Sequence, residues 1–381
     1  MDVSRGEYEN RISKLRNWMA ERRVDAAVIS PGSNMRYLSG TENAGMMVIP
    51  LDGEPFLIAQ YAFGDGLAEE ESFLEVRIVK PKYGLSAKEV VKADLAKAAV
   101  EWLKESGVKV RRLAVEKSKE GKFLRDLRKA FKRARRRVLF IDLSNVLRDM
   151  RAVKSEEEVK LIEESAKIAI AAFEDAVEQL REGASEAEIA NRLEYAIRER
   201  GAEGPSFDSI VAFGEHTYNA HHVPTSRRLK KGELVLFDFG ARFKGYCSDM
   251  TRTFVFGREP TAGLRERMEA VISAQQAALG VIRGGVRIEV PDIEARKALT
   301  NRGLAEEFVH SLGHGVGLDI HEYPRLLVGQ EGELKEGMTV TVEPGIYIKG
   351  WGGIRFEDTV VVGRNSPKIL TQALGKDLRV G

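Results

Sequence analysis

The sequence contains one cysteine, Cys247, and no long hydrophobic run. A single cysteine excludes an intrachain disulfide, a cysteine-ligated zinc site and an iron–sulfur cluster, and it fits a reducing cytoplasm. No apolar run approaches the roughly 18 residues that a membrane-spanning helix requires. The opening residues, MDVSRGEYENR, are charged from the second position, so we expect no secretory signal. We therefore predict a cytoplasmic protein without a membrane partner.

The sequence also has no large excess of positive or negative residues. The 60 lysines and arginines nearly balance the 58 aspartates and glutamates, which argues against a surface built for nucleic acid or for an anionic membrane. We interpret one basic run, residues 129–137, as the solvated end of a helix, with nucleic-acid binding as the alternative. Only 6 glutamines and 9 asparagines accompany 31% charged residues, a composition that hints at a heat-loving source.

The length of 381 residues predicts two domains. Residues 1–148 alternate helical and extended patterns, with a hairpin expected around Asp52-Gly53, and this predicts an α/β domain. Residues 149–381 open with a helix whose Ser155 begins an S-x-x-E capping signal. Strands separated by glycine-rich turns then dominate, so we expect an α+β domain with an antiparallel sheet.

Four carboxylates occupy unusually apolar surroundings in the second half of the chain. Each lies in or beside an extended apolar pattern, and the turns FKGY and KGWGG would fold each pair into a hairpin. Burial of an unpaired carboxylate is costly, so positive charge should lie close by. The four are Asp238 and Asp249 on one predicted hairpin and Glu343 and Glu357 on the other.

Divalent metal ions could supply that positive charge. Two ions would balance four carboxylates, and all six histidines lie between residues 216 and 321, so an imidazole ligand is available. A ligand set of this mostly hard kind suits manganese, cobalt, iron or zinc. Two neighbouring ions would activate water and polarise a carbonyl, which is chemistry typical of hydrolysis.

Other catalytic motifs are absent from the sequence. HEYPR (321–325) lacks the second histidine of a zincin helix, and neither a P-loop nor a G-x-S-x-G nucleophile elbow occurs. Cys247 is a poor nucleophile candidate because the nearby Asp249 disfavours a thiolate.

Several segments resemble the successive signatures of the metal-dependent pita-bread peptidases, a group that contains prolidase, aminopeptidase P and methionine aminopeptidase. They are DFGARFKGYCSDMTRTF, HSLGHGVGLDIHE, TVEPGIYI and GIRFEDTVVV, and LRDMRAVKSEEEVKLIEESAKIA resembles the start of the family's catalytic domain. The first domain matches more weakly. The resemblance implies a creatinase-N-like α/β domain over residues 1–148 and a pita-bread catalytic domain over 149–381.

The resemblance also implies roles for single residues at a two-metal centre. Asp249 and Glu357 would bridge both ions, and Glu343 would also act as general acid and base. His321 would stabilise the oxyanion that forms at the scissile carbonyl. The implied metal ligands are Asp238, Asp249, His314, Glu343 and Glu357.

Further residues would act on the substrate. His221 stands seventeen residues before Asp238, at the place of a catalytic, substrate-contacting histidine, and its neighbour His222 leaves that choice open. Arg325 resembles the arginine with which archaeal-type prolidases bind the terminal carboxylate of the substrate.

Two residues beside the implied ligands complete the set. Thr251 would orient Asp249. Arg355 lies two residues before Glu357, which makes it a candidate to orient that ligand and to contact the substrate.

We predict that this protein hydrolyses the peptide bond preceding proline in Xaa-Pro dipeptides, using two manganese or cobalt ions, with zinc or iron as alternatives. An aminopeptidase P acting on longer peptides is the runner-up, because motif spacing does not determine substrate length. A non-catalytic peptide- or nucleic-acid-binding module on the same fold is a third reading, and the complete ligand set opposes it. The resemblance further suggests a homodimer.

Overall fold

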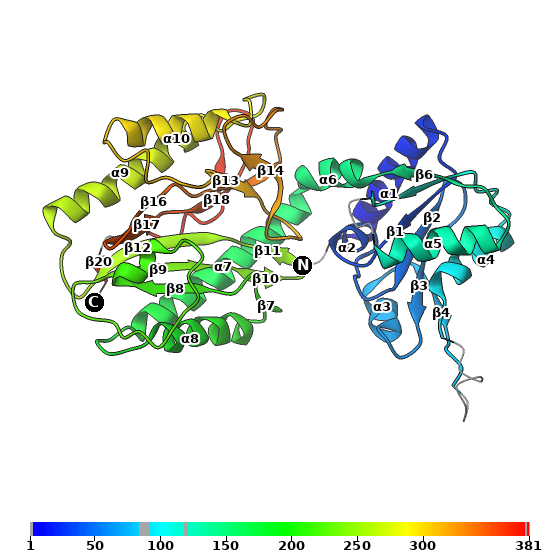
Figure 1. Ribbon diagram of the computed structural model, residues 1–381, viewed down its shortest axis with the longest axis horizontal. Helices are drawn as coiled ribbons and strands as arrows, with labels where there is room; N and C mark the ends of the chain where they lie inside the picture. Colours follow the sequence, from blue (N-terminus) through cyan, green and yellow to red (C-terminus); the bar gives the residue numbers. More distant parts are fainter. Residues whose placement is uncertain (1–2, 84–91, 118–120, 378, 381) are drawn as a thin grey trace. The chain divides into compact units, whose positions relative to one another are not determined.

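The computed structural model describes residues 3–83, 92–117, 121–377 and 379–380, which form two compact units (Figure 1). The N-terminal unit is Val3–Arg151 and the C-terminal unit is Ala152–Gly381. The predicted boundary between residues 148 and 149 stays a prediction. It lies inside helix α6 (Ser144–Ala152), which the sequence patterns did not indicate.

The N-terminal unit is an α/β domain, as its alternating pattern predicted. Its sheet has the strand order β4-β3-β2-β1-β5-β6, in which β1 is parallel to β5 and antiparallel to β2. The expected hairpin at Asp52-Gly53 joins β2 to β3, and Gly53 has a φ of 107°, which favours glycine. The strands are β1 (Ala26–Ile29), β2 (Met46–Pro50), β3 (Phe56–Gln60), β4 (Glu75–Val79), β5 (Arg112–Val115) and β6 (Leu139–Asp142), and the helices before α6 are α1 (Arg5–Glu21), α2 (Ser33–Ser39), α3 (Asp65–Glu71), α4 (Leu95–Glu105) and α5 (Lys122–Arg133).

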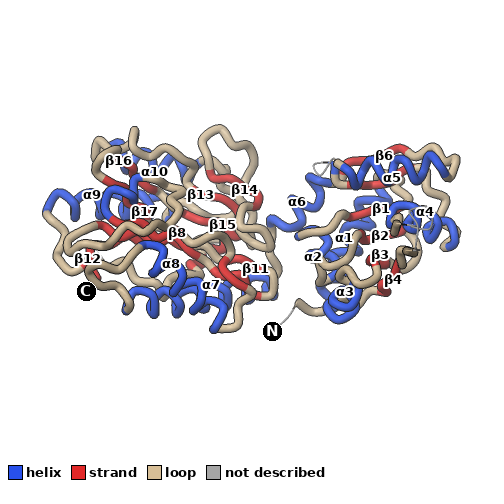
Figure 2. The backbone as a smooth tube through the Cα atoms, turned by 60° about the horizontal axis from the view of Figure 1, so that its bottom comes forward, coloured by secondary structure: helices blue, strands red, loops and turns tan. Residues whose placement is uncertain are grey.

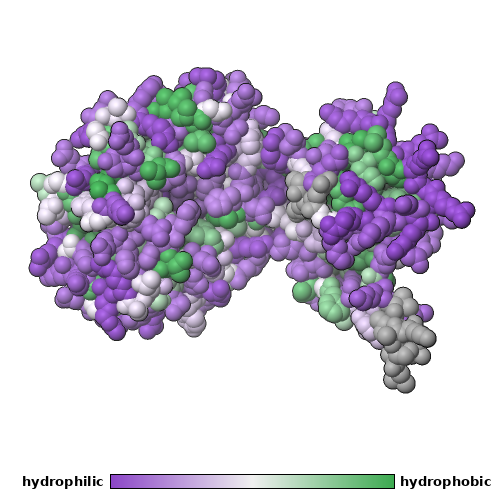
Figure 3. Space-filling model, in the orientation of Figure 1, coloured by the Kyte–Doolittle hydropathy of each residue, from purple (hydrophilic) through white to green (hydrophobic). Residues whose placement is uncertain are grey.

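The basic run of the sequence lies at the end of α5. This helix packs into the core through Leu124, Leu127 and Phe131, so its cations face outward, and hydrophilic side chains cover it in Figure 3. Residues 135–137, together with Arg128, line a shallow hollow of about 460 Å³. All of the predicted site residues belong to the other unit.

The C-terminal unit consists of mainly antiparallel sheets between two pairs of helices (Figures 1 and 2). Helices α7 and α8 pack on the sheet β20-β12-β9-β8, and α9 and α10 pack on the sheet β14-β13-β15-β18-β19. The helices are α7 (Glu156–Glu178), α8 (Glu186–Glu199), the 3₁₀ helix η3 (Gly214–Tyr218), α9 (Ala262–Leu279) and α10 (Val290–Thr300). The strands are β7 (Gly204–Pro205), β8 (Ile210–Phe213), β9 (Leu234–Phe239), β10 (Ala241–Phe243), β11 (Tyr246–Cys247), β12 (Met250–Phe256), β13 (Gly313–Gly315), β14 (Glu322–Leu326), β15 (Thr339–Val342), β16 (Gly345–Ile348), β17 (Gly352–Arg355), β18 (Asp358–Val361), β19 (Lys368–Ile369) and β20 (Arg379–Val380).

The capping signal at the start of this unit is confirmed. Ser155 Oγ accepts a hydrogen bond from Glu158 N, and Glu158 Oε2 accepts one from Ser155 N, so α7 begins with a complete capping box. Among the helices that the structure describes, none combines the length and apolarity needed to cross a membrane.

Both predicted hairpins are present, and they position the acidic residues. Asp238 lies in β9 opposite Thr251 of β12, and Asp249 directly precedes β12. The short strands β10 and β11 form the turn between them. Glu343 precedes the antiparallel pair β16–β17 and Glu357 follows it. The two hairpins therefore deliver four carboxylates to the interior of one unit.

Candidate metal centre

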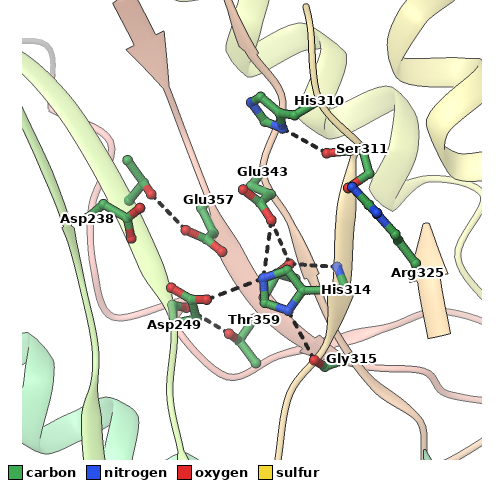
Figure 4. A network of polar contacts seen from close by, with 12 residues as sticks. Asp238, Asp249, His310, Ser311, His314, Gly315, Arg325, Glu343, Glu357 and Thr359 are labelled. Atoms are coloured by element: carbon green, nitrogen blue, oxygen red, sulfur yellow. Dashed lines mark hydrogen bonds and ion pairs between the residues drawn. The ribbon is translucent and has the colours of Figure 1, made fainter. Parts of the chain in front are cut away.

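The five residues that the resemblance implies as metal ligands lie around one space (Figure 4). His314 Nε2 lies 3.5 Å from Asp249 Oδ2 and 3.4 Å from Glu343 Oε1. One ligand atom from each of Asp249, His314 and Glu357 fits within a group whose members lie within 4.8 Å of one another. Asp238 faces the same space from β9.

The strand β13 holds His314 in a fixed orientation. Its backbone N–H donates to Thr341 Oγ1 at 3.1 Å, and its ring Nδ1 lies 3.0 Å from Gly315 O. Because a carbonyl only accepts, Nδ1 carries the proton and Nε2 is left to face the carboxylates. Strand packing is tight here, since a Cβ at Gly313 would lie 2.1 Å from Thr341 O. Glycine is therefore required beside this histidine.

Two buried side chains orient the carboxylates. Thr251 Oγ1 donates to Glu357 Oε2 at 2.7 Å, and Arg355 Nε donates to Thr251 Oγ1 at 3.0 Å. Arg355 Nη2 also donates to Asp238 Oδ2 at 2.6 Å. Thr251 thus acts on Glu357 rather than on Asp249, the neighbour that the sequence suggested.

The shifted pKa values of the clustered residues indicate that the site lacks positive charge. Burial, followed by the negative charge of neighbouring carboxylates, raises the pKa of Asp249 and of Glu357 well above the ordinary values. Burial likewise raises the pKa of Glu343 to about 8 and lowers the pKa of His314 to about 4. Asp238 Oδ1 and Glu357 Oε1 are buried and have no hydrogen-bond partner.

This donor set fits divalent metal ions. Orphaned buried carboxylate oxygens are rare and costly unless a cation or water satisfies them. A neutral imidazole nitrogen facing several carboxylates is a ligand set that manganese, cobalt, iron and zinc accept.

Comparison with known proteins agrees with this geometry. Residues 160–364 match the model of metallopeptidase family M24, and residues 11–153 match the creatinase/prolidase N-terminal domain. The chain belongs to metallopeptidase family M24. It is a metal-dependent peptide hydrolase with the fold that its motifs predicted.

Relatives of this M24 peptidase cover nearly its full length. It is 36% identical to the Xaa-Pro dipeptidase of Pyrococcus horikoshii over 95% of this chain and 97% of that protein. The solved prolidase of Pyrococcus furiosus has a TM-score of 0.80 at 34% identity, covering 94% of this chain and 99% of its own. The X-Pro aminopeptidase of Thermotoga maritima has a TM-score of 0.86 at 32% identity, covering 97% and 99%.

The M24 site contains two residues to which the sequence analysis gave no role. His310 Nε2 lies 3.0 Å from Tyr347 OH, and that hydroxyl accepts a hydrogen bond from Arg355 Nη1 at 2.5 Å. Burial lowers the pKa of His310 to about 4 and raises the pKa of Tyr347 to about 12. His310 is part of the quoted HSLGH motif, but its partner Tyr347 lies 37 residues away, so sequence spacing could not pair them.

Two residues that were predicted to contact the substrate are buried and bonded to other protein groups. His222 is 9% exposed, and its Nε2 lies 2.8 Å from Glu186 Oε2, outside the carboxylate cluster. Arg355 is 2% exposed and uses its donors on Thr251, Tyr347 and Asp238. This guanidinium compensates a buried carboxylate, and a substrate contact by Arg355 stays a prediction.

The remaining candidates are all exposed to solvent. His221 is exposed, and the ring centroid of His321 lies 4.3 Å from that of His314. Arg325 stands opposite His314 in β14, is exposed, and its Nε donates to Ser311 Oγ at 3.2 Å. Glu322, the acid that could have neutralised Arg325, is instead paired with Lys154 at 3.0 Å.

Proposed function

We propose that this M24 metallopeptidase hydrolyses the bond preceding proline in Xaa-Pro dipeptides. The observation that carries the proposal is the meeting of Asp238, Asp249, His314, Glu343 and Glu357 around one space in a chain that is 36% identical to an Xaa-Pro dipeptidase over 95% of its length. The Xaa-Pro dipeptidases of Pyrococcus horikoshii and Pyrococcus furiosus both reach this identity, which favours dipeptides over longer substrates.

We infer that the five residues hold two divalent ions, with manganese or cobalt preferred and zinc or iron as alternatives. Asp249 and Glu357 would serve as ligands shared by the two sites, Asp238 would complete one site, and His314 with Glu343 would complete the other. When bound, the two metal ions would supply Lewis acidity, which polarises a carbonyl and lowers the pKa of water.

The side chains of the protein supply the remaining steps. Glu343 accepts a proton from the attacking water and passes it to the leaving nitrogen, because its carboxylate stands at the edge of the centre beside Thr341. His321 donates a hydrogen bond to the oxyanion of the tetrahedral intermediate, and His221 contacts the substrate from the opposite segment. Arg325 binds the terminal carboxylate of the dipeptide through its guanidinium group.

An aminopeptidase acting on longer Xaa-Pro peptides is the second candidate. The likeness to the Thermotoga maritima X-Pro aminopeptidase, with its TM-score of 0.86, favours it. The two candidates differ in what the site must do with the carboxyl end of the substrate. A dipeptidase binds a carboxylate attached to proline, whereas an aminopeptidase leaves room for a continuing chain.

A substrate series in defined metals tests the proposal. Purified protein is stripped with a chelator, reloaded separately with manganese, cobalt, zinc or iron(II), and assayed on an Xaa-Pro dipeptide, its C-terminal amide and an Xaa-Pro-Xaa tripeptide. We expect manganese or cobalt to restore activity and the dipeptide to be preferred. Equal cleavage of all three substrates would select the aminopeptidase, and no cleavage of any would reject both.

Three further properties belong to the same proposal. We infer a homodimer that works in the cytoplasm of a heat-loving organism, on the grounds of the family resemblance, the single cysteine and the sparse amides. Light scattering after gel filtration measures the mass in solution, and a monomer would remove the first inference.

A further inference from the structure

A buried carboxylate outside the metal centre is a hydrogen-bond hub. Glu186 is the first residue of α8 and is 0% exposed. Its oxygens accept from Phe213 N at 2.9 Å, Thr225 N at 3.0 Å and Thr225 Oγ1 at 2.7 Å. Two ring nitrogens, His216 Nδ1 at 2.9 Å and His222 Nε2 at 2.8 Å, complete the set.

These contacts identify the cluster as a hydrogen-bonding hub rather than a second metal site. The ligand atoms of Glu186, His216 and His222 are close enough to hold an ion. A carboxylate, however, offers about four lone-pair positions, and Phe213 N, Thr225 N and Thr225 Oγ1 already occupy three of them. The N–H and O–H groups of Thr225 point their positive ends at the same oxygens, where they would repel a cation. Burial alone would raise the pKa of Glu186, but the Thr225 and His222 hydrogen bonds lower it, so the group is an anion.

The segment that Glu186 holds is also anchored on its other side. Thr217 Oγ1 accepts a hydrogen bond from Gly353 N at 2.7 Å, and a Cβ at Gly353 would lie 2.2 Å from Thr217 O. Arg355 Nη2, which pairs with Asp238, lies 3.5 Å from Ala220 O. The chain from residue 214 to 225 is thus fixed between α8 and β17.

His221 lies in the middle of this fixed segment. Its two neighbours are the anchored residues, since Ala220 contacts Arg355 and His222 contacts Glu186. Residues 219–222 form a turn closed by a hydrogen bond from His222 N to Asn219 O at 3.1 Å, and in this turn His222 is buried on the hub while His221 is exposed. Because the guanidinium that contacts Ala220 O also pairs with Asp238, the turn that carries His221 lies beside the carboxylate cluster.

We propose that Glu186 is a positioning residue for peptide hydrolysis, which fixes His222 and Thr225 and thereby directs His221 toward the substrate. This inference rests on the proposed function, because it assumes that His221 contacts the substrate. It explains why two histidines stand side by side in NAHHVPT. One of them anchors the segment and the other faces the site.

A double-mutant cycle tests whether Glu186 acts through His221. The variants are Glu186→Gln, His221→Ala and the double variant, all assayed as metal-loaded enzyme on an Xaa-Pro dipeptide. Glu188→Gln is the matched control, because it removes a carboxylate from the same first turn of α8 but contacts Arg181 instead of the 213–225 segment. We expect Glu186→Gln to lower kcat/KM about 10-fold in the wild-type background and less than about 2-fold in the His221→Ala background. Glu188→Gln should leave kcat/KM unchanged.

A second readout does not depend on activity. In protein labelled with ¹⁵N-histidine, the hub predicts a proton on Nδ1 of His216 and on Nε2 of His222, and NMR distinguishes these tautomers. Glu186→Gln should change both signals. Thr225→Val, which removes one donor and keeps the shape of the side chain, is a milder variant if Glu186→Gln fails to fold. It should also lower kcat/KM when His221 is present and have little effect when His221 is replaced by alanine.

The outcomes separate this inference from the proposed function. Equal losses from Glu186→Gln with and without His221 would overturn the positioning role, as would ¹⁵N signals that do not change. A wild-type enzyme that cleaves no Xaa-Pro substrate would reject the proposed function, while the tautomers would still report on the hub.

Discussion

Arg355 Nη2 lies 2.6 Å from Asp238 Oδ2, and the two side chains are only 3% and 14% exposed. The same guanidinium donates to Thr251, which in turn donates to Glu357. One cation therefore orients carboxylates on both hairpins. It pairs with one of the four clustered carboxyl groups, and bound metal ions would neutralise the charge that the others carry when ionised.

The metal-free protein should lose stability as the pH rises from 6.5 to 8. Burial raises the pKa of Glu343 to about 8 from an unfolded value of 4.5, so the folded state keeps a proton that the unfolded chain releases. The lowered pKa values of His310 and His314 act in the opposite direction, but only below their unfolded value of 6.5. Above pH 6.5 the carboxyl groups therefore determine how the free energy of unfolding changes with pH. Glu343 alone lowers it by up to about 2 kcal/mol between pH 6.5 and 8.

Urea unfolding of chelator-treated protein at several pH values measures this slope. Reloading with metal should flatten it, because the bound carboxylates are ionised throughout the window. Glu343→Gln should also flatten part of it. Stability that rises between pH 6.5 and 8 in the metal-free protein would contradict the prediction.

Loss of either proposed bridging ligand should release both ions. Asp249→Asn keeps the size of the side chain but removes a full charge from the group that also contains His314 and Glu357. We expect the metal content to fall from about two ions per chain to fewer than one, and activity to disappear. Asp238→Asn should release mainly one ion. Elemental analysis after gel filtration measures the content, and a fully loaded Asp249→Asn protein would argue against bridging.

A threonine beside the centre should tune metal affinity. Thr251→Val removes the hydroxyl that donates to Glu357 at 2.7 Å, and loss of such a partner typically costs about 10–100-fold in affinity or activity. Thr253→Val is the control, because Thr253 is equally buried in the same strand but donates to Arg355 O. Competition with a fluorescent chelator gives both affinities. Equal losses would mean that the effect is general destabilisation of β12.

The local part of this structure could be predicted because its signals are close together in sequence. Ser155 and Glu158 are one helical turn apart, and the Asp52-Gly53 and KGWGG turns determine their own hairpins. The acids of the site were found because carboxylates in apolar strands need compensation.

Contacts between distant segments could not be predicted in the same way. In the sequence, Glu186 is indistinguishable from any acidic residue in the first turn of a helix. In the structure it accepts hydrogen bonds from residues up to 39 positions away. Glu322 is close to Arg325 in sequence, but the fold pairs it with Lys154, 168 residues away. Spacing alone carries no information on such pairs.

His321→Ala should reduce turnover without loss of metal. The side chain of His321 packs beside His314, and no ligand role is proposed for it. Removal of a group that stabilises an oxyanion costs about 10²–10³ in kcat, so we expect kcat to fall while KM changes little. Steady-state kinetics together with metal analysis separate the two effects. A change confined to KM would assign His321 to substrate positioning instead.

Arg325 should decide whether the enzyme prefers dipeptides. Arg325 stands in β14 opposite His314, and its Nε donates a hydrogen bond to Ser311 Oγ. The acid that could neutralise it, Glu322, is committed to Lys154 in a buried pair. A bidentate guanidinium–carboxylate contact is directional, and its loss would cost about 2–3 kcal/mol, or roughly 30–150-fold in kcat/KM. We expect Arg325→Ala to weaken cleavage of an Xaa-Pro dipeptide by this factor and to leave its C-terminal amide and an Xaa-Pro-Xaa tripeptide nearly unchanged. Arg364→Ala, which removes an exposed cation from the same unit, controls for the loss of charge. If Arg325→Ala weakened all three substrates equally, Arg325 would act on the stability of β14 and not on the carboxyl end of the substrate.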